Sequence, residues 1–142
     1  MRVFFLASAV AAAVASVVPM AAAKPGFTTK YVYYNVGGDS AEKIYRAMLS
    51  KGPKVNGAKA YAATSAVSSQ DGKLMQEKTC RIEDYRLRID FEIKLPKIRN
   101  EKVLDASDRV RWRQFSQFLK RHEETHRSIW LGCAADLERK VQ

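Results

Sequence analysis

Residues 85–95 read Tyr-Arg-Leu-Arg-Ile-Asp-Phe-Glu-Ile-Lys-Leu, and this alternation of apolar and charged side chains decides the fold. Successive side chains of a β-strand point to opposite faces, so a period of two predicts a strand with one buried face and one face in water. Pro96 predicts the end of that strand, because proline has no N–H to donate to a ladder. Upstream, Ser-Ser-Gln-Asp-Gly at 68–72 predicts a turn that connects a hairpin.

Two more strands and a helix are expected before this hairpin. Residues 31–36 are rich in Tyr and Val and end at a Gly-Gly turn, and residues 59–67 alternate weakly, so both predict strands. Between them, a helix is expected to begin at Asp39 or Ser40 and to close at Gly52-Pro53.

The C-terminal region predicts one long helix after capping residues at 105–108. Apolar and His side chains recur there at steps of three to five residues, which indicates a helix with its core-facing side along that stripe. The stripe consists of Val110, Phe115, Leu119, His122, His126, Ile129, Cys133 and Leu137. Gly132 is a position where the helix can bend or break. The element order predicts an α+β domain, a small antiparallel sheet with helices on one face.

Both histidines of the chain lie in one pentad, His122-Glu123-Glu124-Thr125-His126. Residues four apart on a helix share a face, so His122 and His126 are candidate ligands of one tetrahedral Zn²⁺. Glu123, next to the first ligand, is the candidate general base for a water that the metal activates, as in the H-E-x-x-H pattern of metallopeptidases. Two alternatives stay open: a pair of exposed helix histidines, and a metal site without catalysis.

The third ligand is left open by the sequence, because the chain has no third His. On a straight helix Glu138 lies about 18 Å beyond His126, so it can serve only if the chain turns back near Gly132. Otherwise the ligand comes from upstream, and the candidate carboxylates there are Asp39, Glu42, Glu101 and Asp105.

The N-terminus predicts export. Residues 1–23 combine Arg2, an apolar run and a final Ala-Ala-Ala, which together describe a secretory signal peptide cleaved after Ala23; an uncleaved anchor is the alternative. Residues 24–142 then form a single domain in a secreted or periplasmic protein. In an oxidising compartment Cys80 and Cys133 predict one disulfide, with two free thiols as the alternative.

The composition is basic, with 25 Lys+Arg against 15 Asp+Glu and a formal net charge of +10. Basic side chains crowd the approach to the pentad: Lys97, Arg99, Lys102, Arg109, Arg111, Arg113, Lys120, Arg121 and Arg127. They form either a solvated helix face or a surface that attracts an anionic envelope polymer. A nucleic-acid partner is not expected for an exported chain, and we expect a monomer.

The region 31–140 resembles a bacterial family of predicted secreted zinc-dependent proteases related to gluzincin-like zincins. The likeness rests on Tyr33-Tyr34-Asn35-Val36-Gly37-Gly38, Gly52-Pro53, Thr64, Cys80, Leu95-Pro96, Trp112, Phe115, Leu119 and Arg121-His122-Glu123-Glu124-Thr125-His126-Arg127. Where the family has a Trp shortly after the position of Thr64, this chain has Ser65-Ala66. The resemblance implies a zincin-like fold, His122 and His126 as ligands, Glu123 as catalytic base and Glu138 as a third ligand.

Together these features predict an exported zinc metalloprotease, a hydrolase that cleaves peptide bonds of a peptide or protein substrate with metal-activated water. The alternative is a non-catalytic envelope protein that uses the same fold, with or without metal, to bind an anionic partner.

Overall fold

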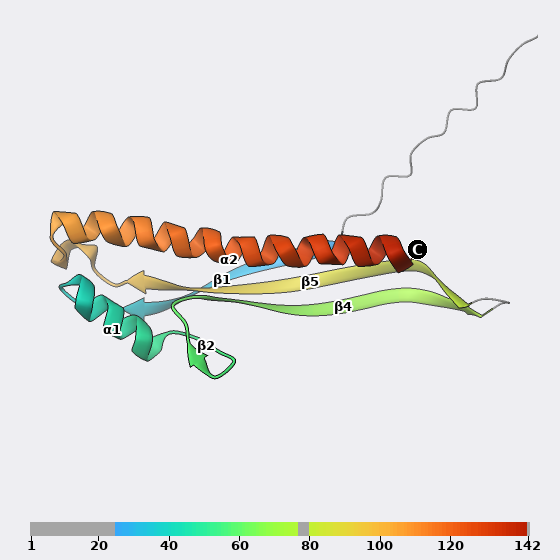
Figure 1. Ribbon diagram of the computed structural model, residues 1–142, viewed down its shortest axis with the longest axis horizontal. Helices are drawn as coiled ribbons and strands as arrows, with labels where there is room; N and C mark the ends of the chain where they lie inside the picture. The colour runs from blue at the N-terminus through green and yellow to red at the C-terminus, as the bar shows by residue number, and fades with distance from the viewer. Residues whose placement is uncertain (1–24, 77–79, 142) are drawn as a thin grey trace, which may run out of the picture.

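The computed structural model describes residues 25–76 and 80–141 of the 142-residue chain. The predicted signal peptide, residues 1–23, lies outside the described residues. The elements include a sheet of three long strands, a helix beneath one end of it and a long C-terminal helix above it (Figure 1). The fold is therefore α+β, as predicted.

The main sheet has the strand order β1-β5-β4, with β1 at Gly26–Val36, β4 at Ala63–Gln76 and β5 at Cys80–Ile98. β4 and β5 are antiparallel, but β1 pairs with β5 in parallel, so the prediction of an antiparallel sheet is wrong for β1. The reason is topological. The chain crosses from β1 to β4 through a helix, and β5 returns between the two strands.

The alternating segment of β5 is confirmed. Its six apolar side chains are at most 8% exposed, whereas the charged residues between them line the opposite face, where Arg88 pairs with Asp90 and Lys30 of β1 pairs with Glu92. The apolar residues are Tyr85, Leu87, Ile89, Phe91, Ile93 and Leu95. Because the two faces meet different surroundings, the pattern fixes which side of the sheet receives the long helix.

The hairpin strands extend further than predicted. Residues 68–72 continue β4 instead of turning, and the ladder absorbs Gly72 as an irregularity between Asp71 and Lys73. Pro96 does not end β5. β4 pairs with β5 only as far as Ala63 opposite Lys94, so at Pro96 only β1 still pairs with β5. A strand with one free side tolerates a proline, which has no N–H to donate.

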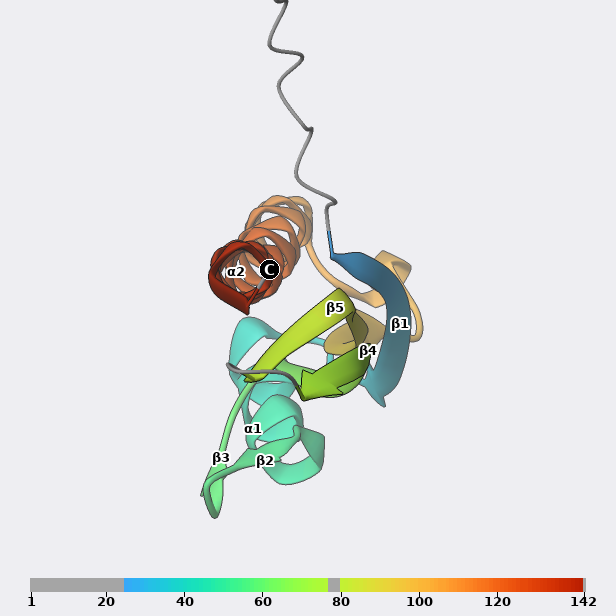
Figure 2. The ribbon, with the colours of Figure 1, turned by 90° about the vertical axis from the view of Figure 1, so that its right-hand side faces the viewer.

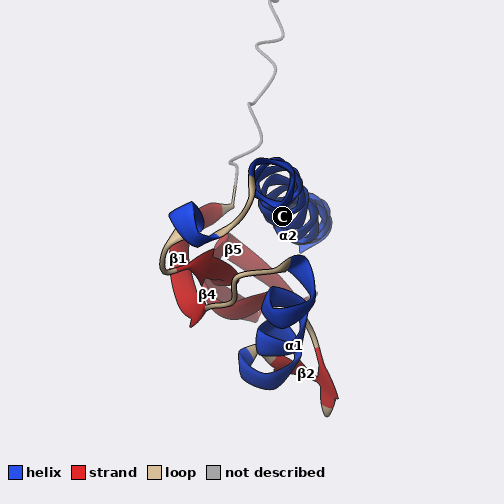
Figure 3. Cartoon of the chain, turned by 90° about the vertical axis from the view of Figure 1, so that its left-hand side faces the viewer, coloured by secondary structure: helices blue, strands red, loops and turns tan. Residues whose placement is uncertain are grey.

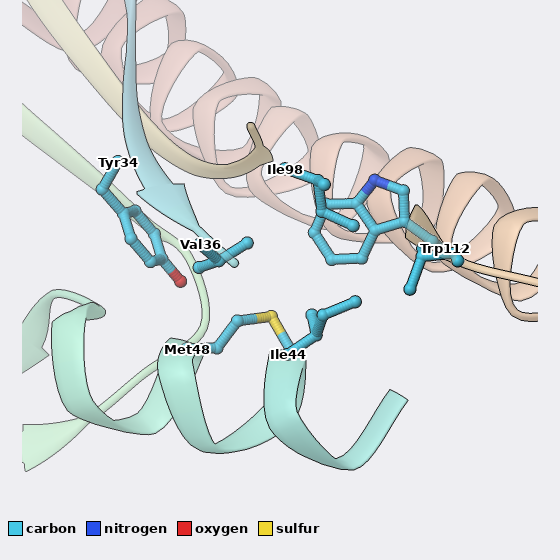
Figure 4. Packing of buried hydrophobic residues seen from close by; sticks show 7 residues of the cluster. Tyr34, Val36, Ile44, Met48, Ile98 and Trp112 are labelled. Carbon is cyan, nitrogen blue, oxygen red and sulfur yellow. The ribbon is translucent and has the colours of Figure 1, made fainter. Parts of the chain in front are cut away.

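Helix α1, Ala41–Lys51, begins as predicted, because the Ser40 hydroxyl accepts from the backbone N–H of Lys43. It packs beneath one end of the sheet and joins a cluster that includes residues from β1, β5 and the start of the long helix (Figure 4). The cluster consists of Tyr34, Val36, Ile44, Met48, Ile98, Leu104 and Trp112. Two short strands, β2 at Lys54–Val55 and β3 at Ala58–Lys59, form a separate hairpin beside it.

Helix α2, Ala106–Val141, runs along the sheet, and its first turns lie beside α1 (Figures 2 and 3). There the Asp108 carboxylate accepts a hydrogen bond from the backbone N–H of Ala41 at the start of α1. A short 3-10 turn, Glu101–Val103, connects β5 to it. Its 36 residues correspond to about 54 Å at 1.5 Å per residue. The helix continues through Gly132 without interruption, so the break that this glycine would allow does not occur. Neither helix of the described residues has the length and apolar composition that a bilayer span requires.

The core-facing side of α2 is not the predicted stripe. The buried residues are Trp112, Leu119, Glu123, Ala134 and Glu138. Trp112, Glu123 and Ala134 recur every 11 residues, close to three full turns, so a straight helix presents all three to the sheet. Only Leu119 of the predicted stripe is buried, and Phe115 is partly so; Ile129 is 58% exposed and Leu137 is 44% exposed. Because two of the inward-facing residues are glutamates, the spacing of apolar residues did not identify the buried face of α2.

Candidate metal centre

The two histidines converge, as predicted from their spacing. Both are exposed on α2, and their Nε2 atoms lie 3.1 Å apart. The rings are nearly perpendicular, with centroids 4.8 Å apart. The same separation fits a hydrogen bond between the two ring nitrogens, in which the tautomer decides which ring donates. The helix alone produces this geometry, since residues four apart are one turn above each other.

The spacing of the two nitrogens fits one zinc ion. Two ligands at about 2.0–2.1 Å from a tetrahedral centre lie about 3.3 Å apart, close to the observed 3.1 Å. Imidazole is also a ligand type that zinc accepts. His122 and His126 are therefore a suitable half of a zinc site.

Glu123 lies on the neighbouring part of the helix surface and is only 5% exposed. Its Oε2 accepts a hydrogen bond of 2.8 Å from the Thr64 hydroxyl of β4, and that hydroxyl is also 3.0 Å from the Glu123 carbonyl oxygen. The carboxylate thus lies between α2 and an outer strand of the sheet. The histidines, one residue before and three residues after it, are exposed to solvent.

The contact between Thr64 and Glu123 was not predicted from the individual residues. The sequence contains Thr64 in a weakly alternating strand, 59 positions before Glu123, and no local pattern relates the two. Only the order of motifs in the resembling family included it.

The other glutamate of the pentad contacts the opposite flank of the sheet. Glu124 accepts a hydrogen bond of 2.5 Å from the hydroxyl of Tyr31 on β1, and this bond is the main cause that raises the pKa of Tyr31. Arg127 donates to Thr29 of the same strand. Glu123 and Glu124 therefore attach α2 to β4 and β1 respectively, the two outer strands.

Glu138 is not brought to the histidines, so the prediction that it is a third ligand is not supported. Because α2 is unbroken, Glu138 stays about 18 Å along the helix from His126. Its Oε1 accepts a hydrogen bond of 2.7 Å from the backbone N–H of Leu87, and the residue is 4% exposed. Its side chain is engaged with β5 instead.

The upstream carboxylates are not brought there either. Asp105 accepts from the backbone N–H of Asp108 at the start of α2, which lowers the pKa of Asp105 and leaves it about 25 Å from His122 along the helix. Asp39 bonds Lys43, and the other two carboxylates, Glu42 and Glu101, pair with Arg46 and Arg113. Within residues 25–76 and 80–141, no three His, Cys, Asp or Glu side chains form a group that could hold an ion.

The predicted disulfide is not formed: Cys80 and Cys133 are both free and exposed. Cys80 begins β5 and lies seven strand residues, about 23 Å, beyond Leu87. Helix α2 runs towards the Cys80 end of β5, and Cys133 lies five residues, about 7.5 Å along the helix, before Glu138, the neighbour of Leu87, so it is on the side away from Cys80. A disulfide needs Cα atoms within about 7 Å, so the long hairpin separates the two thiols too far.

Several of the basic side chains near the pentad already have acidic partners. Arg111 pairs with Asp108 and Arg113 with Glu101, each at 3.3 Å, and Lys120 lies 4.0 Å from Glu124. These pairs reduce the field that the positive side chains present to an anionic partner.

Comparison with known proteins identifies a family for the sequence. The family model described as "Bacterial protein of unknown function (DUF922)" matches residues 31–142. No curated protein and no solved structure matches the chain.

Proposed function

The chain belongs to the DUF922 family of bacterial proteins of unknown function, and we propose that this member is a zinc-dependent peptidase. The observation that carries the proposal is the 3.1 Å separation of the His122 and His126 Nε2 atoms. A buried carboxylate, Glu123, follows the first of them in the sequence. Zinc, when bound, supplies a Lewis acid that polarises a carbonyl group and makes water a nucleophile at neutral pH.

The residues of the chain have separate roles in this proposal. His122 and His126 hold the ion through their Nε2 atoms. Glu123 accepts the proton of the water that attacks the peptide carbonyl carbon, and it returns that proton to the amine nitrogen when the C–N bond breaks. The carboxylate is suited to this role because its burial and the hydrogen bond from Thr64 keep it in a defined position.

Strand β4 is the proposed binding edge for the substrate. It pairs with β5 on one side, and in the described residues no strand pairs with its other side. Unpaired backbone groups of an edge strand bind an extended peptide by adding it to the sheet. Because Thr64 of β4 contacts Glu123, a peptide on this edge would pass close to the site.

Exposed apolar side chains of α2 support a peptide as the substrate. Phe118 is 54% exposed and Trp130 is 52% exposed, and Ile129 and Leu137 are similarly exposed. Phe118 also lies beside His122, with ring centroids 6.0 Å apart. Phe118 would therefore offer an apolar contact to a peptide side chain next to the histidines. We also propose that the protein acts after export, as the residues at 1–23 predict.

The test begins with the metal. The purified chain is titrated with Zn²⁺, and a peptide library is incubated with it in the presence and absence of a chelator. We expect one zinc ion per chain and cleavage that the chelator abolishes. His126→Ala is expected to lose most of the zinc affinity. If the substitution leaves the zinc affinity unchanged, His126 is not a ligand. If no zinc binds at micromolar concentrations, the proposal is wrong.

A second function is favoured by one observation, the lack of a third protein ligand among the described residues. Catalytic zinc sites have three protein ligands and one open position. A chain that binds zinc through two imidazoles without hydrolysing any peptide would be a non-catalytic metal-binding or partner-binding protein. The same library experiment distinguishes the two functions.

A further inference from the structure

The hydrogen bond between Thr64 and Glu123 joins an edge strand to the pentad. Thr64 Oγ1 lies 2.8 Å from Glu123 Oε2, in a part-buried position. A hydroxyl carries one hydrogen, and a bond donated to a carboxylate is shorter and stronger than one donated to a neutral carbonyl. The Thr64 hydroxyl therefore favours the carboxylate oxygen over the Glu123 carbonyl oxygen at 3.0 Å.

The buried carboxylate depends on this donor. Glu123 is 5% exposed, and among the described residues it takes part in no ion pair. A buried charged group is costly unless hydrogen bonds compensate for lost water. Ala66, two residues after Thr64 and thus directed to the same side of β4, has no hydrogen-bonding side chain, and neither has Ala62, just before the strand. Thr64 is the position from which β4 supplies a side-chain donor here.

We propose that Thr64 is a positioning residue: its hydroxyl holds the Glu123 carboxylate in the orientation in which it accepts the proton of the attacking water. This inference rests on the proposed function and deepens it. It also assigns two tasks to β4, since the strand that would bind the peptide also orients the base. Displacement of a reacting group by about 1 Å costs up to about a hundredfold in rate, so the loss of one orienting bond is measurable.

The experiment compares Thr64→Val with Thr64→Ser in the full chain loaded with zinc. Valine has the shape of threonine but no hydroxyl, whereas serine keeps the hydroxyl. We expect Thr64→Val to lower kcat on the order of tenfold or more, with KM and zinc content unchanged, and Thr64→Ser to restore most of kcat. The matched control is Thr28→Val, which removes a hydroxyl bonded to a carboxylate, Asp90, at 2.6 Å on an exposed part of the sheet. It is expected to leave kcat unchanged.

Each outcome decides between the proposals. An active wild-type chain in which Thr64→Val leaves kcat unchanged overturns the positioning role alone. So does a fall in kcat that Thr64→Ser fails to reverse, or one that is matched by a loss of zinc or by a lower unfolding temperature. A wild-type chain that binds zinc and cleaves no peptide overturns both the positioning role and the proposed peptidase.

Discussion

Helix α2 contains two buried glutamates in different surroundings, and the difference indicates a catalytic role for one and a structural role for the other. Glu123 and Glu138 are 5% and 4% exposed, so burial alone does not distinguish them. Glu123 contacts a side-chain hydroxyl on edge strand β4 and follows a histidine whose Nε2 is 3.1 Å from a second imidazole. Glu138 contacts a backbone N–H of the central strand β5. A buried carboxylate is therefore a candidate for catalysis only where its neighbours are groups that take part in a reaction.

The surroundings of Glu138 explain its burial structurally. β1 begins at Gly26, opposite Arg88 of β5, so the β1 ladder does not extend to Leu87. The Glu138 carboxylate accepts the Leu87 N–H one residue before the pairing with β1 begins, as a strand carbonyl would. A buried N–H without an acceptor is costly, so this side chain stabilises the end of the sheet.

The largest expected effect comes from exchanging each glutamate for glutamine. Glu123→Gln is expected to lower peptide hydrolysis by at least about a hundredfold with zinc binding retained, because an amide cannot accept the proton. Glu138→Gln keeps an oxygen acceptor for Leu87 and is expected to leave hydrolysis unchanged. Turnover and zinc content are measured for both variants. Equal losses of turnover in the two variants would show that Glu123 and Glu138 do not have different roles.

The next effect concerns stability. Glu138→Ala removes the acceptor of the Leu87 N–H and is expected to lower the free energy of unfolding by about 2–3 kcal/mol, because a hydrogen bond to a charged group is lost inside the protein. The measurement is urea unfolding of the metal-free chain. Asp136→Ala is the control, since Asp136 is exposed and bonded to Arg139 on the same turn, and its cost is expected within about 0.5 kcal/mol.

Zinc titration of the same Glu138→Ala variant tests whether Glu138 is a metal ligand. If Glu138 were a third ligand, its removal would weaken zinc binding strongly. We expect zinc affinity equal to that of the wild-type chain. A large loss of affinity without a loss of stability would reverse the assignment of the two glutamates.

The smallest effect is expected at Gly132, the position between the two regions. A Cβ atom at Gly132 would meet nothing within 4 Å, so Gly132→Ala fits the straight helix. Alanine is favoured over glycine inside a helix by up to about 1 kcal/mol, and the variant is expected to be more stable by that order. Thermal unfolding and zinc titration are the measurements. Loss of zinc binding in this variant would indicate that α2 must bend at Gly132, which would bring Glu138 towards the histidines.

The accuracy of sequence reasoning differed between the sheet and the helix for a physical reason. The central strand was predictable because residues 85–95 alternate between two very different surroundings, and the hydrophobic effect acts on each side chain in turn. The buried face of α2 was not, because two of its five buried side chains are carboxylates whose partners lie on strands. A hydrophobic pattern contains no information about a hydrogen bond to a residue 51 or 59 positions away.

The sequence by itself determined the local geometry of this protein: the strand faces of β5, the start of α1 at Asp39 or Ser40, and the convergence of His122 and His126 one helical turn apart. Only the tertiary structure decided which glutamate belongs with the histidines, that β1 runs parallel to β5, and that the cysteines stay apart. The physical reason is the separation along the chain over which each kind of interaction acts. Helical spacing and strand alternation act over a few residues, whereas the position of a carboxylate against a particular strand depends on how the whole sheet packs beneath α2.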